Sequence, residues 1–109
     1  MYARVTQFDI DVVQISASAA LDRFKELVLP ELEKQPGYRG LLVLQNPEGR
    51  GVLVSLWASA EAERGSRATG YYEEQVRKFV TFYKQPPGRE AFQVTHLDVP
   101  EAAAAGGVA

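Results

Sequence analysis

The segment GLLVLQNPEGRGVLVSLWAS, Gly40 to Ser59, decides the fold class of this chain. Two apolar runs flank NPEGRG, whose proline and two glycines predict a tight turn, so we expect an antiparallel hairpin of strands 38–45 and 51–58. A hairpin with one face in water alternates apolar and polar residues. Here both faces are apolar: in the first strand Gly40, Leu42 and Leu44 point one way and Leu41 and Val43 the other, and in the second strand Val52, Val54 and Leu56 are opposite to Leu53 and Trp57. Both faces therefore need cover from other parts of the protein.

A strand and a helix are predicted before the hairpin. Residues 2–10 mix β-branched, aromatic and polar residues in near alternation, which is typical of a strand. The following segment, SASAALDRFKELVLPELEKQPG, has apolar residues at helical spacing and offers Ser16 or Ser18 as its N-cap. We expect Pro30 to bend this helix and the Pro-Gly pair at 36–37 to end it.

A short helix is predicted directly after the hairpin. Ser59 is a suitable N-cap, and Glu61 and Glu63 in the first turn place negative charge where the helix dipole favours it. We expect Gly65 and Gly70 to interrupt this helix, because glycine is a poor helix former.

The last two elements are a longer helix and a strand. The helix is predicted from Thr69, because TGYYEEQVRKFVTFY has an apolar and aromatic face at helical spacing. That face carries Tyr72, Val76, Phe79 and Tyr83. Residues 90–99, EAFQVTHLDV, alternate again and predict the final strand.

The order strand, helix, strand, strand, helix, strand predicts an α+β ferredoxin-like plait, βαββαβ, with an antiparallel sheet and both helices on one face. We expect one domain over residues 1–99 and a loose Ala/Gly-rich tail over residues 100–109. Because the helices cover only one apolar face of the hairpin, the other face is expected to pack against the same face of a second copy. The predicted assembly is a homodimer that meets through its sheets.

Composition excludes several kinds of partner and site. The chain has 109 residues, a formal net charge of −2 and scattered Lys and Arg, which argues against nucleic acid as a partner. It has no run of membrane-spanning length, so we expect a soluble, cytoplasmic protein with no membrane partner. It has no cysteine and one histidine, so neither a disulfide nor a usual transition-metal site is expected.

Three segments resemble the antibiotic biosynthesis monooxygenase (ABM) domains of the dimeric α+β barrel superfamily. They are ARVTQF at 3–8, LPELEKQPGYRGLLVL at 29–44 and VLVSLWASAEA at 52–62. The resemblance implies a dimer whose sheets form a barrel, with a pocket in each subunit between the sheet and its helices. It also implies a choice of activities, because some members oxidise polyphenolic substrates with dioxygen without metal or flavin, and others bind and degrade haem.

Five residues are expected to form the site. Trp57 matches by position a tryptophan that lines the pocket in several ABM members, and it can stack on a planar ligand. His96, the only histidine, carries an imidazole, a group that can take a phenolic proton near neutral pH. Arg4 can bind a phenolate or a carboxylate. Tyr71 and Tyr72, at the start of the longer helix, can line the pocket.

Each of these residues also has a purely structural interpretation. Trp57 and Tyr72 fit the core of the fold, and Arg4 fits an ion pair with an acidic neighbour. His96 fits a hydrogen-bonded or solvent-facing position on its strand. The sequence leaves these alternatives open.

The leading functional hypothesis is a cofactor-independent monooxygenase that oxidises a small phenolic or polyketide-like aromatic substrate with dioxygen. The alternative is a non-catalytic dimer that carries or senses a small aromatic molecule on the same scaffold. Haem binding or degradation is a third hypothesis, but the longer helix lacks the histidine that binds iron in that branch. An asparagine contributes to the site of the best-understood ABM oxygenases, and the only asparagine here is Asn46, in the predicted turn.

Overall fold

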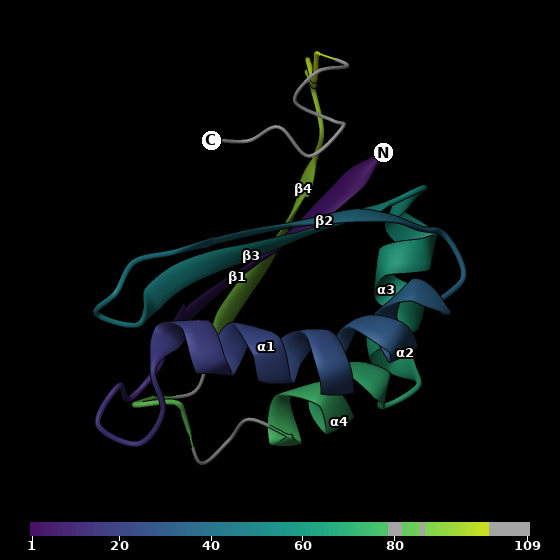
Figure 1. Cartoon of the computed structure of the whole chain (residues 1–109). Coiled ribbons are helices and arrows are strands. Elements are labelled where there is room, and N and C mark those ends of the chain that lie inside the picture. The colour runs from purple at the N-terminus through teal and green to yellow at the C-terminus, as the bar shows by residue number, and fades with distance from the viewer. Residues whose placement is uncertain (79–81, 86, 101–109) are drawn as a thin grey trace.

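A four-stranded antiparallel sheet organises the chain (Figure 1). The structure, a computed structural model, describes residues 1–78, 82–85 and 87–100, except for the side chain of Tyr72. The elements are β1 (Tyr2–Asp9), α1 (Ala17–Leu27), α2 (Leu29–Glu33), β2 (Tyr38–Gln45), β3 (Arg50–Trp57), α3 (Ala60–Ala68), α4 (Tyr71–Arg77) and β4 (Gly88–Gln93). The strand order is β2-β3-β1-β4, and every neighbouring pair is antiparallel. This arrangement confirms the expected α+β ferredoxin-like fold.

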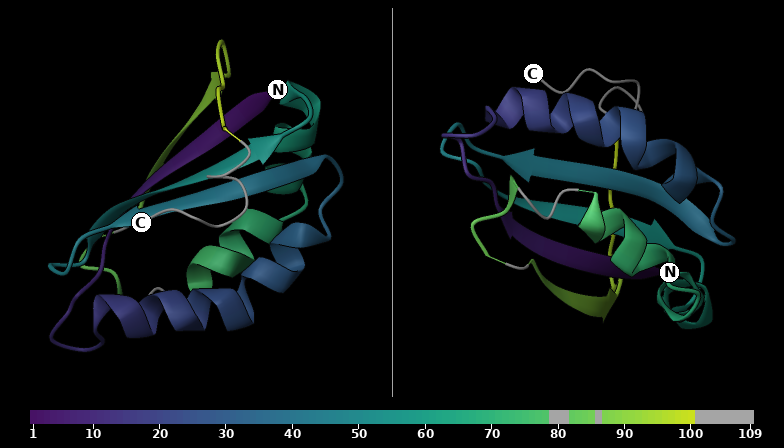
Figure 2. Two further views of the ribbon diagram at one scale, coloured as in Figure 1. Left: turned by 45° about the horizontal axis from the view of Figure 1, so that its top comes forward. Right: turned by 90° about the horizontal axis from the view of Figure 1, so that it is seen from below.

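The helices lie on one side of the sheet. Helices α1, α2 and α4 run across one face, and α3 stands at the end where β1 begins and β3 ends (Figure 2). The strand register places Thr6, Leu53 and Val43 side by side across the sheet, and these residues face α1. Because successive residues of a strand point to opposite faces, the next row faces away from the helices.

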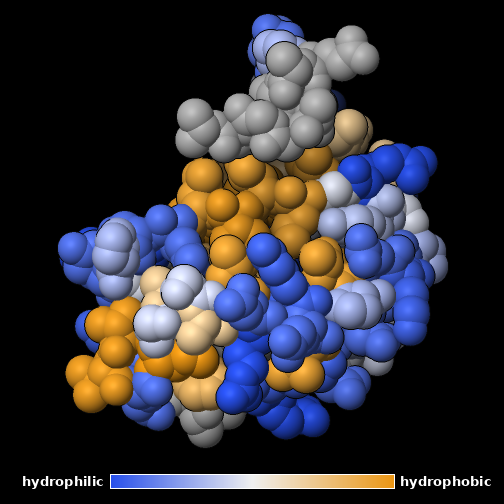
Figure 3. Space-filling model, viewed as in Figure 1, coloured by the Kyte–Doolittle hydropathy of each residue, from blue (hydrophilic) through white to orange (hydrophobic). Residues whose placement is uncertain are grey.

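The sheet face away from the helices is mainly apolar, with Gln7 and Glu90 as polar residues on β1 and β4. We call it the open sheet face, and it carries Ala3, Val5, Leu42, Leu44, Val52, Val54, Leu56 and Phe92. Leu42, Leu44 and Phe92 keep 53%, 52% and 46% of their surface exposed in the single chain. An apolar area is visible above β2 and β3 in the space-filling view (Figure 3). The hairpin therefore has two apolar faces, as its sequence predicted, and the described helices cover only one of them.

The bend predicted at Pro30 divides the first helical segment in two. Ser16 caps α1, since its side chain accepts a hydrogen bond from the backbone N–H of Ala19 at 3.2 Å. The break falls at Val28, and Pro30 then occupies the first turn of α2. A proline there leaves no helical hydrogen bond unmade, because the first-turn N–H groups have no partner within the helix.

Two expectations for the second half of the chain are wrong. Gly65 does not interrupt α3, which runs unbroken past it, and the short helix ends instead near Gly70, whose φ of +79° is left-handed. Tyr83 is not on the longer helix, because it forms an isolated antiparallel bridge with Ile10. Phe79, a member of the predicted apolar face, lies outside the described residues.

The final strand is shorter than predicted and does not contain His96. Within the described residues, strand β4 is an edge strand that pairs with β1, and the ladder ends where Gln93 lies opposite Tyr2. One further hydrogen bond follows, from the backbone N–H of Val94 to the carbonyl of Met1 at 2.9 Å. His96 therefore lies beyond the sheet, in a segment without regular secondary structure. Of the predicted tail, residues 101–109 lie outside the described residues.

None of the helices in the described part of the chain combines the length and apolar character that crossing a bilayer requires.

Candidate functional site

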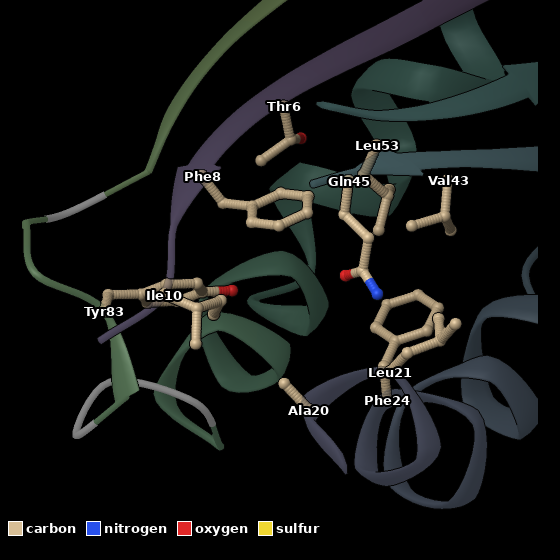
Figure 4. A pocket seen from close by; sticks show the side chains of 10 residues that line it. All are labelled: Thr6, Phe8, Ile10, Ala20, Leu21, Phe24, Val43, Gln45, Leu53 and Tyr83. Carbon is tan, nitrogen blue, oxygen red and sulfur yellow. The ribbon is translucent and has the colours of Figure 1, made fainter. Parts of the chain in front are cut away.

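A hollow between the sheet and the helices is the candidate site. Its first part, about 60 Å³, lies between α1 and the sheet. Side chains of the sheet and of α1 face one another across it, and Tyr83 closes one side (Figure 4). Its second part, about 70 Å³, lies toward α2 and α4. The two parts share Thr6, Phe24, Leu53 and Tyr83 in their walls, so we treat them together as the helix–sheet hollow.

The walls of the helix–sheet hollow are mainly apolar, with polar groups toward its two ends. Gln45 is at the α1 end, and its side-chain amide donates to the carbonyl of Ala17 at 3.2 Å. Arg4, Tyr71 and Gln75 are at the other end. Among the described residues that line the hollow, none is a carboxylate or an imidazole. The permanent charge at its wall is therefore that of Arg4.

Arg4 is held in a buried network. The alternation of β1 places it on the helix side of the sheet, where 4% of its surface remains exposed. Its Nη1 atom donates to Ser66 Oγ at 2.7 Å and to Glu63 Oε2 at 3.3 Å. Its guanidinium carbon lies 5.0 Å from the centre of the Trp57 ring, a cation–π distance. These contacts fix the guanidinium at the wall of the hollow.

Glu63 is shared between two arginines. Arg67 donates from Nε to Oε2 at 2.7 Å and from Nη2 to Oε1 at 2.8 Å, in addition to the contact from Arg4. Burial alone would raise the pKa of Glu63, but the hydrogen bonds and charge of Arg67 and of Arg4 outweigh it and lower the pKa. Glu63 is therefore ionised at neutral pH. Counted over the described residues, two guanidinium groups and one carboxylate give this network one net positive charge.

The lowered pKa of Glu63 predicts a loss of stability in acid. Because the pKa is lower in the folded chain, the unfolded chain binds more protons as the pH falls. The stability that Glu63 contributes is complete above its ordinary pKa of 4.5 and is lost as the pH falls through the lower folded-state pKa. Urea denaturation from neutral pH to about pH 3 should show this loss, and a Glu63→Gln variant should lose less. Equal losses in the two proteins would contradict the assignment.

Tyr71 brings a buried hydroxyl to the same end of the hollow. It is the first residue of α4, directly after the left-handed Gly70. Within the part of the chain that the structure describes, its hydroxyl is buried and has no hydrogen-bond partner. Burial raises the pKa of Tyr71; the charge of Arg4 opposes this increase, and Glu31 and Tyr38 add to it. Tyr71 is therefore a neutral phenol, and a buried hydroxyl without a partner costs about 1–3 kcal/mol of stability.

Comparison with known proteins places the chain in a family. The family model described as antibiotic biosynthesis monooxygenase, ABM, matches residues 1–96. The chain belongs to the ABM family. No curated protein matches the sequence.

Solved structures share the fold of this ABM chain at low identity. SnoaB, a cofactor-independent oxygenase from Streptomyces nogalater, is 14% identical, with a TM-score of 0.69 over 88% of this chain and 94% of that one. A putative antibiotic biosynthesis monooxygenase from Nitrosomonas europaea is 13% identical, with a TM-score of 0.69 over 88% of this chain and 100% of that one. Another putative antibiotic biosynthesis monooxygenase, from Deinococcus radiodurans, is 11% identical, with a TM-score of 0.70 over 92% of this chain and 98% of that one. At these identities the likeness shows the fold.

The structure of the ABM chain brings together some of the five site residues predicted from sequence. Arg4 and Tyr71 line the same end of the helix–sheet hollow. Trp57 is fully buried behind Arg4, donates from Nε1 to Ser55 Oγ at 2.9 Å, and does not line the hollow as described. His96 is exposed beyond β4 and lines neither part. The backbone of Tyr72 is in α4, but its side chain is outside the described part of the structure.

The ion pair with an acidic neighbour that the sequence allowed for Arg4 is present, with Glu63 as the partner. Sequence reasoning did not identify Glu63 as that partner, and it did not find the roles of Ser66 and Arg67 in the network. The available signal was the spacing of Glu63, Ser66 and Arg67, which share one face of a helix at i, i+3 and i+4. Among the described residues, no group of three His, Cys, Asp or Glu is placed to hold a metal ion.

Proposed function

We propose that this ABM chain is a cofactor-independent monooxygenase that oxidises a small phenolic substrate with dioxygen in the helix–sheet hollow. The observation that carries the proposal is an apolar hollow with a buried, net positive group at one end, Arg4 with its network. Family membership supports it, as does the shared fold of SnoaB, which is a cofactor-independent oxygenase.

The chemistry requires an electron-rich ring, because the substrate itself supplies the electrons. A phenol with hydrogen on the carbon opposite its hydroxyl, together with one dioxygen, gives one para-quinone and one water. One oxygen atom forms the new carbonyl and the other leaves as water, so no outside reductant is needed. The phenolate is the reactive form, and the positive charge of Arg4 stabilises it in a setting of low polarity. Apolar walls keep bulk water from the reacting ring.

A second copy of the chain completes the assembly in this proposal. The open sheet face is the surface that a partner sheet would cover, because its Leu42, Leu44 and Phe92 are about half exposed in one chain. A contiguous apolar face of this kind marks an interaction surface. A twofold-related copy presents the same face and is self-complementary to it.

Oxygen uptake with labelled dioxygen tests the proposed reaction. Across a panel of one-ring phenols and hydroquinones, at least one phenol should consume one dioxygen per molecule and give a quinone that carries one labelled oxygen. Arg4→Gln should lower kcat/KM about a hundredfold, the effect of removing a charge-stabilising group from an active site. Arg23→Gln, which removes an exposed positive charge on α1, should leave the rate unchanged. Formation of hydrogen peroxide with an unlabelled product would contradict the monooxygenase reaction.

One observation favours the second candidate, a carrier or sensor. No described residue that lines the hollow is an imidazole or a carboxylate, so the walls supply no ordinary general base. A binding protein needs none. Saturable binding of phenols, with no oxygen uptake for any of them, would contradict the monooxygenase and support a carrier or sensor.

A further inference from the structure

One end of the helix–sheet hollow presents two hydrogen-bond donors that approach from different elements. Arg4 comes from β1 and Tyr71 from the first turn of α4, and both line the part of about 70 Å³. The hydroxyl of Tyr71 is buried there without a partner among the described residues. Because buried polar groups are normally hydrogen-bonded, a hydroxyl in this position is a donor that a ligand can use.

The charge at this end favours an anion. Glu63 does not neutralise Arg4, because the same carboxylate also accepts two hydrogen bonds from Arg67. The network keeps one net positive charge, and Trp57 and Ser66 hold the Arg4 guanidinium in place at the wall. Glu31 is the acidic residue whose charge is felt at Tyr71, and it is exposed, so water screens it.

The size of the hollow sets a limit on the ligand. Each part, about 60 and about 70 Å³, is smaller than the roughly 150 Å³ cavity that takes up benzene. The two parts share Phe24 and Leu53 in their walls, and only their combined volume approaches the size of one aromatic ring. A ligand with fused rings is larger than this combined volume.

We infer that the ligand is a one-ring phenol bound as its phenolate, with the ionised oxygen held between the guanidinium of Arg4 and the hydroxyl of Tyr71. The ring then lies along Phe24 and Leu53 in the apolar part of the hollow. Glu63 and Arg67 are positioning residues, because they act on the ligand only through Arg4. The inference rests on the proposed function for the use of the hollow as a phenol site.

This assignment needs no general base in the hollow. A phenol ionises in solution, and the site selects the anion because a positive charge and a neutral donor meet it there. Bound phenol therefore loses its proton at a lower pH than free phenol does. The same end disfavours an uncharged ring of equal size, because the buried hydroxyl of Tyr71 would then stay without a partner among the described residues.

Titration with 4-nitrophenol in the absence of oxygen tests the inference without turnover. Its phenolate is yellow and its phenol is colourless, so absorbance reports the ionisation state of the bound dye. We expect the bound dye to ionise at least one pH unit below the free dye, a tenfold preference for the anion. Nitrobenzene should bind at least tenfold more weakly, and a two-ring nitronaphthol should also bind more weakly. Equal binding of nitrobenzene would overturn the anion site, and tighter binding of nitronaphthol would overturn the one-ring limit.

Variants separate a ligand role from a structural role. Tyr71→Phe should weaken binding of the phenolate about tenfold, as loss of one charge-assisted hydrogen bond does, while Tm stays the same or rises. Unchanged affinity with a lower Tm would make Tyr71 structural and overturn its assignment. Arg4→Gln should abolish the preference for the anion, and Arg4→Lys, which keeps the charge, should retain part of it if Arg4→Gln does not fold. Arg23→Gln is the matched control and should bind as the wild type does.

The outcomes distinguish this inference from the proposed reaction. Preference for the phenolate without oxygen uptake for any phenol leaves the anion site standing and overturns the monooxygenase. Oxygen uptake that is unaffected by Arg4→Gln and Tyr71→Phe overturns the anion site and leaves the reaction standing.

Discussion

Replacing Glu63 with glutamine is expected to destabilise the folded chain by about 3 kcal/mol at neutral pH. The substitution keeps the shape of the side chain but removes the carboxylate that Arg4 and Arg67 share. Arg4, 4% exposed, is then left as a buried charge without its counter-ion, which is the costly way to break a buried ion pair. Urea denaturation monitored by circular dichroism measures the change in the free energy of unfolding.

Glu61→Gln is the matched control for this prediction. Glu61 is on the same helix, but its side chain is 80% exposed and its contact with Arg64 is long, at 3.8 Å. A surface substitution of this kind should change stability by less than about 0.5 kcal/mol. If Glu63→Gln had an equally small effect, the network would not hold Arg4 in place, and the positioning role of Glu63 would be lost.

Placing a lysine at the centre of the open sheet face is expected to separate the proposed dimer into monomers. Val54 is flanked in register by Val5 and Leu42, so a lysine there adds a charge in the middle of the apolar face. Both copies carry the substitution, and the charges would have to be buried without partners when the sheets meet. Val54→Lys should weaken the dimer at least about a hundredfold, as measured by analytical ultracentrifugation.

Val13→Lys is the control for the dimer. It is the same substitution at a valine that is 92% exposed and lies outside the sheet. It should leave the dimer intact. A monomeric wild type, or a Val54→Lys variant that remains dimeric with the same affinity, would show that the open sheet face is not the interface.

The hairpin shows how much of the fold the sequence could predict. Because successive side chains of a strand point to opposite faces, the residues of each strand within 40–57 can be assigned to two faces without knowledge of the rest of the chain. Strand β2 has the predicted bounds, and the break before Pro30 follows from covalent geometry. These features depend on local rules, which is why they could be predicted.

The predictions that were wrong concern features that depend on partners far away in the chain. The end of β4 is set by where β1 ceases to pair, so His96 could not be placed from its own neighbours. Gly65 weakens a helix locally, but a cap at Ser59 and the Glu63–Arg67 pair hold α3 together across it. The helical spacing of the apolar residues predicted Tyr83 on a helix, but Tyr83 instead forms a β-bridge with Ile10.

The candidate site was predicted only in part for the same reason. Arg4 and Tyr71 were singled out by chemistry, because a charge on a strand and a phenol at a helix start are unusual enough to notice. The partner of Arg4 is 59 residues further along the chain, and no local pattern connects Arg4 with Glu63. The sequence could not say that one carboxylate would serve two arginines, which is the feature that leaves a net positive charge beside the hollow.

A crystal structure of the protein with a one-ring phenol that has hydrogen on the carbon opposite its hydroxyl, prepared without oxygen, shows directly whether the helix–sheet hollow is the binding site. We expect one ring inside the hollow, with its oxygen atom about 2.7–3.2 Å from both the Arg4 guanidinium and the Tyr71 hydroxyl. A ring bound elsewhere, for example on the open sheet face, with the hollow filled by protein side chains, would contradict this expectation.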